Sequence, residues 1–143
     1  MCLGMDAIIV EGMTTEMTLF DFPEEVDTAF TTGDCWHLAR TIHLLTGYPV
    51  VTFQHFDYGQ DLWAHAGNRL PDGRIVDIEG ILPEQTWLDQ WSHNVDADPD
   101  TVYAREWSLA QWDGELEICD FDFEYPEVSN DVSRYAQEVI AHI

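Results

Sequence analysis

The chain has 143 residues, the size of one domain, and its 45% hydrophobic content argues against a disordered protein. It holds 28 acidic residues against five arginines and no lysine, and a net charge of −23 argues against direct binding to nucleic acid or to an anionic membrane. It has no apolar run of membrane-spanning length and no basic segment of a secretory signal near its start, so we expect a cytoplasmic protein without membrane contact.

Three cysteines, Cys2, Cys35 and Cys119, are too few and too scattered for a disulfide framework, which favours a reducing compartment. Cys35 and His37 are only two residues apart, and no second pair stands at ligand spacing. We therefore expect no metal site, and no motif points to a cofactor.

The chain opens with two short apolar runs. Residues 7–10 and 17–20 are typical of short strands. Residues 21–30 predict a turn or a short helix that opens at Pro23.

Residues 34–46 predict the main helix. Their apolar side chains recur at helical spacing, and Gly47 ends the segment. Three residues are suited to cap its start: Asp34, Thr32 and Thr31. Cys35 stands at the beginning of the apolar stripe, where the positive end of the helix dipole favours a thiolate.

Two strands and a turn follow. Residues 50–53 predict a strand, and residues 55–61 a loop. In residues 62–80, the segment "LPDGR" is typical of a hairpin with a three-residue loop and a glycine bulge.

The register of that hairpin decides which side chains meet. Pairing Leu70 with Arg74 sets Gly67 opposite Asp77 and His65 opposite Glu79. One face then carries Trp63, His65, Gly67, Ile75, Asp77 and Glu79. The other, apolar face carries Leu62, Ala64, Ala66, Leu70, Val76 and Ile78. His65 and Asp77 are therefore expected to be diagonal neighbours.

The last third of the chain predicts a helix at 82–94, a strand at 101–109, an acidic strand at 114–125 and a helix at 129–143. We treat residues 1–143 as one domain. Its core motif covers residues 31–80, and an acidic strand and a helix complete it over residues 113–143.

The chemistry-bearing residues come in the order Cys35, His65, Asp77. A thiol nucleophile needs a base within hydrogen-bonding reach, and the base needs a third group that fixes its orientation. A buried structural thiol is the alternative interpretation of Cys35, because free cysteine packs as a small hydrophobic residue.

The segments "GDCWHLA", "GYPV" and "HAGNRLPDGRIVD" resemble the papain-like cysteine hydrolase superfamily, in particular its permuted NlpC-type peptidases and the transglutaminase-like proteins. The resemblance covers residues 31–80. It implies an α+β fold with the nucleophile at the N-terminus of a central helix that packs on an antiparallel sheet. It also implies a catalytic triad in which Cys35 is the nucleophile, His65 the general base and Asp77 the orienting residue.

Further residues are candidates for the oxyanion hole and the substrate walls. The backbone N–H of Cys35, Gln54 and Trp36 are candidate donors to an oxyanion. Trp36 and Trp63 flank the expected site and are suited to line a substrate pocket.

Two functions remain open at this point. The first is a cysteine hydrolase or acyl transferase that acts on an amide, isopeptide or ester bond of a peptide or protein substrate. The second is an acidic, non-enzymatic binding protein that covers a basic partner, as a nucleic-acid mimic or a phage anti-defence inhibitor does.

Overall fold

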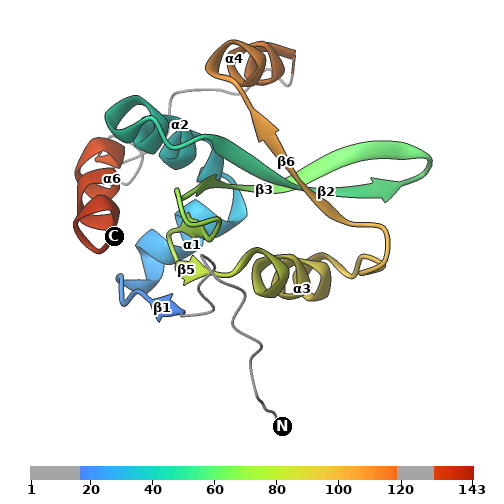
Figure 1. The fold of residues 1–143 in the computed structure, drawn as a ribbon, viewed down its shortest axis with the longest axis horizontal. Coiled ribbons are helices and arrows are strands. Elements are labelled where there is room, and N and C mark those ends of the chain that lie inside the picture. The colour runs from blue at the N-terminus through green and yellow to red at the C-terminus, as the bar shows by residue number, and fades with distance from the viewer. Residues whose placement is uncertain (1–16, 119–130) are drawn as a thin grey trace, which may run out of the picture.

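In a computed structural model, the chain forms an α+β fold in which helices cover both faces of an antiparallel sheet (Figure 1). The structure describes residues 17–118 and 131–143. The elements are β1 (Thr18–Leu19), α1 (Glu24–Thr32), α2 (Cys35–Thr46), β2 (Val50–Asp57), β3 (Gln60–Arg69), β4 (Ile75–Asp77), β5 (Gly80–Leu82), α3 (Glu84–Val95), β6 (Tyr103–Trp107), α4 (Leu109–Ile118) and α6 (Val132–Ala141). The strand expected at residues 7–10, Cys2 and Cys119 lie outside the described residues.

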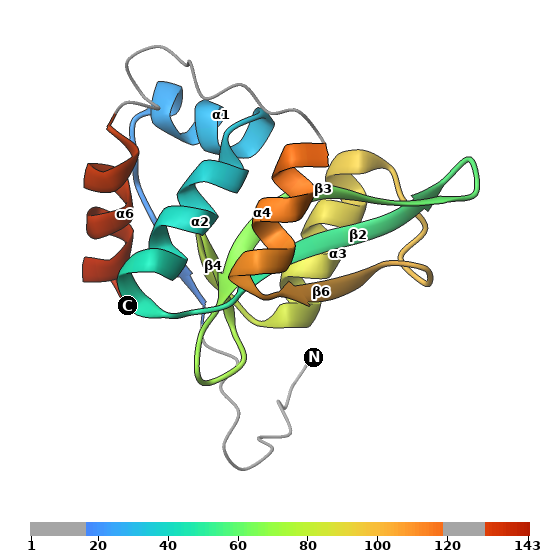
Figure 2. The ribbon, with the colours of Figure 1, turned by 90° about the horizontal axis from the view of Figure 1, so that it is seen from above.

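The strands of the sheet are ordered β1-β5-β4-β3-β2-β6. Helices α1, α2 and α6 pack together on one face, α4 covers the same face near β6, and α3 covers the opposite face (Figures 1 and 2). The central helix α2 therefore packs on the middle of the antiparallel sheet, an arrangement that the resemblance implies. Within the described residues, no helix is long and apolar enough to cross a membrane.

Helix α2 begins at Cys35 and ends where predicted. Gly47 takes the left-handed conformation at φ 83° and its N–H donates to the carbonyl of His43, which closes the helix. The predicted capping is wrong in its details. Asp34 occupies the N-cap position without a side-chain capping bond, and the Thr31 and Thr32 hydroxyls donate back to carbonyls of α1.

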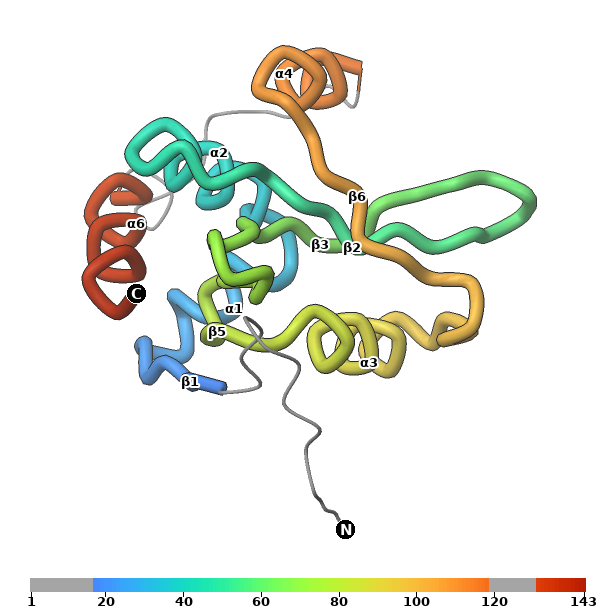
Figure 3. Tube along the Cα trace, in the orientation of Figure 1, coloured from blue at the N-terminus to red at the C-terminus, as the bar shows by residue number. Residues whose placement is uncertain are grey.

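The loop expected at residues 55–61 is wrong, because β2 and β3 continue through it as a long hairpin. Tyr58 and Gly59 form the two-residue turn, with φ 52° and 77°. Two consecutive positive φ angles match the twist of the flanking strands, which is why the turn closes so tightly. The hairpin projects beyond the helices (Figure 3).

The "LPDGR" turn is confirmed, but the strand after it is shorter than expected. The Leu70 N–H donates to the carbonyl of Arg74 at 2.8 Å. Gly73 adopts φ 93°, as its place in the turn requires. Strand β4 ends at Asp77 and turns back into β5, so the predicted pairing of His65 with Glu79 is wrong.

A β-bulge changes the faces of β3. Phe53 pairs with His65, but the next residue, Gln54, pairs with Trp63, so Ala64 is the extra residue. Trp63 therefore packs with the cluster beneath α2 and α4, while Ala64 packs toward α3. The prediction that Trp63 shares a face with His65, and Ala64 with Ala66, is wrong for this reason.

The acidic strand predicted at 114–125 is also wrong over the residues that the structure describes, because residues 109–118 form helix α4. Ser108 and Gln111 form a reciprocal capping box, each backbone N–H donating to the other side chain. Trp112 and Leu116, four residues apart, are the buried side chains of the helix. Residues 119–125 lie outside the described part.

The other predicted elements are confirmed with shifted ends. The strand expected at 17–20 is reduced to β1, and that at 101–109 to β6. The short helix after Pro23 is α1, and the helices expected at 82–94 and 129–143 are α3 and α6.

Candidate functional site

The candidate nucleophile, Cys35, is the first residue of α2 and only 6% exposed. It packs beside Trp36, Ala39 and Ala66 at the inner end of the helix. The first N–H groups of a helix have no partner within it and carry its positive end. The thiol therefore sits where a negative charge is stabilised.

The candidate base, His65, comes from β3 and is fully buried. Within the described residues, β4 pairs with β3 at Asn68 and Arg69 and does not extend to His65. The imidazole stacks on Trp91 of α3, with ring centroids 3.9 Å apart and planes 15° apart. This flat contact fixes the ring and favours its protonated form through the electron-rich face of the indole.

Asp77, at the end of β4, is 2% exposed and accepts three hydrogen bonds. Its Oδ2 accepts from His65 Nε2 at 2.9 Å and from Trp87 Nε1 at 3.0 Å. Its Oδ1 accepts from the backbone N–H of Glu79 at 2.9 Å. A carboxylate held by three donors is fixed in position and kept ionised.

Gly67 brings the two strands close enough for this contact. A Cβ atom on Gly67 would lie 2.7 Å from the carbonyl oxygen of Val76 and 3.6 Å from the Cβ of Asp77. Only a residue without a side chain permits this approach of β4 to β3. The sequence pattern places Gly67 opposite Asp77, and the structure supplies the steric reason.

Cys35 also interacts with the His65 ring. Since Nε2 donates to Asp77, Nδ1 is the nitrogen left for the thiol, and no hydrogen bond of standard geometry reaches this buried atom. The interaction of Cys35 with the ring is thus a close approach rather than a short, aligned hydrogen bond. Contacts between a nucleophile and its base are often this loose before substrate binds.

The surroundings decide the protonation of His65. Burial is the largest single effect and lowers its pKa. The charge of Cys35, the hydrogen bond to Asp77, the close approach of the Cys35 thiol and the charge of Asp77 together outweigh it and raise the pKa of His65 to about 10. These surroundings therefore favour the imidazolium form of His65 beside the Asp77 carboxylate at neutral pH.

The pKa of Asp77 moves the other way. Burial acts to raise it, but the hydrogen bond and the charge of His65, with the Trp87 and Glu79 donors, hold the pKa of Asp77 below its usual value. The structure thus brings Cys35, His65 and Asp77 together in one buried series.

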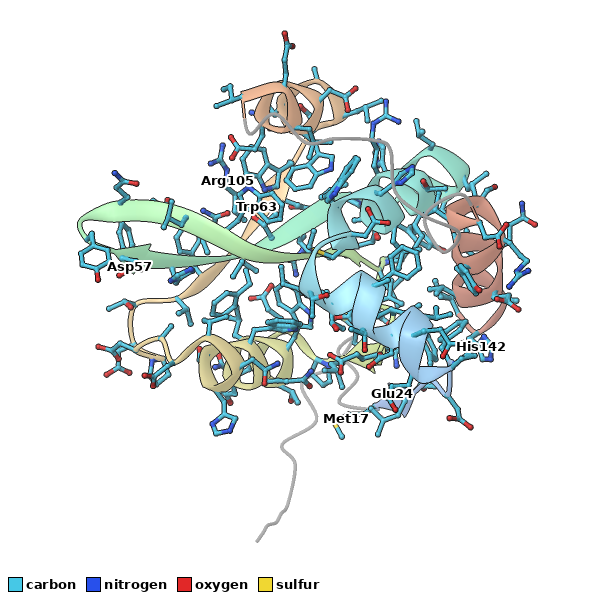
Figure 4. The ribbon with its side chains drawn as sticks, turned by 180° about the vertical axis from the view of Figure 1, so that it is seen from behind. Met17, Glu24, Asp57, Trp63, Arg105 and His142 are labelled. Carbon is cyan, nitrogen blue, oxygen red and sulfur yellow. The ribbon has the colours of Figure 1, made fainter. Side chains whose placement is uncertain are left out.

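A pocket of about 340 Å³ opens at Cys35. Its lining residues come from the α1–α2 junction, β3 and α4: Thr32, Gly33, Cys35, Asp61, Leu62, Trp63, Ala64 and Glu115. Trp63 is half-buried, and its Nε1 donates to Glu115 Oε2 at 3.0 Å. Figure 4 shows Trp63 beneath α4, where its ring packs against Trp112 with ring centroids 5.1 Å apart. The volume suits one side chain or a small ligand.

The other two candidate residues are placed differently. Trp36, the second residue of α2, is fully buried, and its ring stacks on His37 rather than lining the pocket. Gln54 is buried as well. Its Oε1 accepts from Thr52, and its Nε2 donates to Asp61 Oδ1 at 3.0 Å. Gln54 therefore supports the pocket residue Asp61 from behind.

Sequence reasoning missed four residues of this site. The helix predicted over residues 82–94 includes Trp87 and Trp91 without a role for either, although their four-residue spacing places both over one spot. Asp61 was assigned to a loop, and Glu115 to a strand. The "YG" turn and the "SLAQ" capping box are the signals that could have placed them correctly.

Among the described residues, no group of three or more His, Cys, Asp or Glu side chains is arranged to hold a metal ion. Comparison of the chain with protein-family models, with curated proteins and with solved structures found no match. The functional argument therefore rests on the geometry of the site itself.

Proposed function

We propose that this protein is an intracellular cysteine hydrolase or acyl transferase with a papain-like core. The observation that carries the proposal is the buried series Cys35–His65–Asp77, in which each group meets the next and the last is held by three donors. Burying charged groups destabilises a purely structural core, because ions lose their hydration there. It is the arrangement that activates a thiol.

In the proposed reaction, the Cys35 thiolate attacks the carbonyl carbon of an amide, isopeptide or ester. His65 gives its proton to the departing amine or alcohol, which leaves a thioester on Cys35. Water or an amine then attacks the thioester, while His65 takes the proton of that nucleophile. The product leaves as an acid or a new amide, and the thiolate–imidazolium pair is restored.

The oxyanion of the intermediate needs donors that already point at it. The backbone N–H of Cys35, at the first position of α2, has no acceptor within the helix and lies beside the reacting sulfur. Trp63 Nε1 is committed to Glu115, and Gln54 Nε2 to Asp61. We therefore assign the oxyanion contact to the helix N-terminus rather than to these side chains.

The test is acylation by p-nitrophenyl acetate in a Cys2→Ser/Cys119→Ser background. We expect release of p-nitrophenolate and an acetyl group on Cys35 in the intact-mass spectrum. Cys35→Ser should abolish the adduct, and His65→Gln should slow it by about 100-fold or more. His93→Gln is the matched control, because His93 is exposed on α3.

Circular dichroism verifies that each variant folds. Acetylation at another residue, or an equal rate in folded His65→Gln, would contradict the proposal.

The second candidate function is a protein that binds a basic partner, and the observation that favours it is that the arginines are already engaged. All five already have a partner: Arg40 with Asp113, Arg69 with Glu84, Arg74 with Asp72, Arg134 with Asp131, and Arg105 over the ring of Trp107. Most of the acidic groups therefore remain uncompensated. Binding of an arginine-rich peptide that weakens steeply with salt and ignores Cys35→Ser would support this candidate.

A further inference from the structure

The β2–β3 hairpin carries two large aromatic side chains that lie outside the hydrophobic core. Tyr58, in its turn, is 97% exposed, and Phe56, two residues before it, is 57% exposed. The hairpin projects beyond the helices, and Asp57, between the two aromatic residues, lies at its far end (Figures 3 and 4). An exposed aromatic patch on a protein surface marks a site of interaction with a partner.

A third aromatic residue extends this surface along one face of the sheet. Gln54 of β2 pairs with Tyr103 of β6, so their side chains share a face. Phe56, two residues along β2, points to that same face, which makes Phe56 and Tyr103 diagonal neighbours. Tyr103 is exposed as well. Together with Tyr58 at the tip, these two residues form a surface that we call the hairpin patch.

The backbone at Tyr58 is a second observation that points to binding. Its φ of 52° lies in the left-handed region, which a bulky side chain rarely adopts. Asparagine, aspartate or glycine is the usual residue at the first position of such a turn. The exposed ring gains no packing that would offset the strain, so Tyr58 makes the turn less stable than asparagine would. Its presence is explained by contact with a partner rather than by folding.

The charge of the protein selects the chemistry of that partner. A net charge of −23 repels a second copy of the chain, nucleic acid and anionic membranes. Residues 56–62 contain no lysine or arginine, and Asp57 is exposed between two of the aromatic residues. Arg105 stacks on the ring of Trp107, which pairs with Val50 at the opposite end of β2 from the tip. A guanidinium group from outside suits the patch, because it stacks on aromatic rings and pairs with carboxylates.

We propose that the hairpin patch is the docking surface for a protein partner with an arginine-rich surface. Arginine side chains of the partner stack on Phe56, Tyr58 and Tyr103, and the acidic field of the protein attracts the partner. This inference goes beyond the proposed function, because docking at the tip requires no reaction at Cys35. Strand β3 leads from the tip to the pocket, whose wall includes residues 61–64, so the docked partner contacts the hairpin that also forms this wall.

The experiment compares two peptides of equal charge, nona-arginine and nona-lysine. Their affinities for the protein are measured by isothermal titration calorimetry in about 0.15 M salt. The overall field acts on both peptides alike, whereas an aromatic ring favours the guanidinium group, which stacks on it. The ratio of the two affinities therefore reports the contribution of the patch.

Phe56→Thr/Tyr58→Asn removes two rings of the patch and leaves the net charge unchanged. We expect the ratio of nona-arginine to nona-lysine affinity to fall about fivefold. The matched control is Leu44→Gln/Leu45→Gln, which replaces two exposed apolar side chains of α2, at 54% and 51% exposure. It should change the ratio by less than about twofold.

Tyr58→Asn alone separates binding from folding. It should lower the affinity ratio about twofold while the melting temperature rises, so a loss of fold does not account for the weaker binding. Circular dichroism verifies that the two double variants fold.

An equal fall of the ratio in the control, or an unchanged ratio in Phe56→Thr/Tyr58→Asn, would overturn the proposal, because the patch would then not set the preference. No measurable binding of either peptide by the wild-type protein would overturn it as well. Failure of the proposed function looks different. In that case the rate of Cys35 alkylation is the same with and without His65→Ala, and the affinity ratio is unaffected.

Discussion

Asp77→Asn is the substitution that tests the buried series most sharply, because it keeps the shape of the side chain and removes its charge. The carboxylate accepts from His65 Nε2, Trp87 Nε1 and the Glu79 N–H, on both of its oxygens. An asparagine offers one oxygen and one NH₂ group. Either orientation turns that NH₂ group toward at least one of these donors, which then loses its acceptor.

The size of the effect follows from burial. Removing one partner of a buried ion pair costs about 3–5 kcal/mol, and leaving a buried donor unsatisfied costs about 1–3 kcal/mol. These costs overlap, so we expect Asp77→Asn to lower the free energy of unfolding by about 3 kcal/mol. The comparison is Asp113→Asn, which breaks the ion pair with Arg40. The Asp113 side chain is 43% exposed, and solvent screening limits the loss to about 1 kcal/mol or less.

The assay is urea unfolding of both variants at neutral pH, with NMR titration of the His65 ring. In Asp77→Asn the pKa of His65 should fall, because the hydrogen bond and the charge of Asp77 no longer raise it. Equal losses of stability in the two variants, together with an unchanged titration of His65, would refute the reasoning.

Three further effects should be measurable. The pKa of His65 lies above its unfolded value, so its stabilising contribution is complete below about pH 6.5 and is lost as the pH rises toward 10. Chemical unfolding of the wild type and of His65→Gln should therefore show that the difference in their free energies of unfolding shrinks across this pH range. Gly67→Ala should lower the free energy of unfolding by about 1–3 kcal/mol, because the new Cβ meets the Val76 carbonyl. Gly114→Ala in α4 meets nothing within 4 Å and should raise the free energy of unfolding by up to about 1 kcal/mol. The reverse order in chemical denaturation would contradict the packing. Tyr58→Asn should raise the melting temperature, because asparagine tolerates the φ of 52° better, and an unchanged or lower value would count against the two-residue turn.

Local patterns were sufficient to predict the α+β class, helix α2 and the turn that closes on Leu70. Each has a strong punctuation signal, such as Gly47 after the apolar stripe or Gly73 in its turn. The meeting of His65 with Asp77 was also predicted, because the register of a short hairpin follows from its turn.

Two of the errors have the same origin, which is that alternation was extended beyond the point where the backbone breaks it. The bulge at Ala64 moves Trp63 to the other face, and β4 stops at Asp77 because β5 folds back beside it. Neither event leaves a clear local signal. Residues 114–118 belong to a segment with alternating apolar residues, yet the capping box at Ser108 and the packing of Trp112 and Leu116 make residues 109–118 a helix.

The stacking of His65 on Trp91 and the bond from Trp87 to Asp77 depend on α3 crossing the far face of the sheet. The first contact joins residues 26 positions apart, and the second joins residues 10 positions apart on different elements. Both are tertiary contacts, and no local pattern in one sequence specifies them.

The proposed chemistry requires Cys35 and His65 to form a thiolate–imidazolium pair. The most direct measurement is the rate of Cys35 alkylation by iodoacetamide between pH 5 and pH 9, in the Cys2→Ser/Cys119→Ser background with and without His65→Ala. We expect fast alkylation below pH 7 that His65→Ala abolishes. Alkylation that follows an ordinary thiol near pH 8.5, or that requires unfolding, would contradict it.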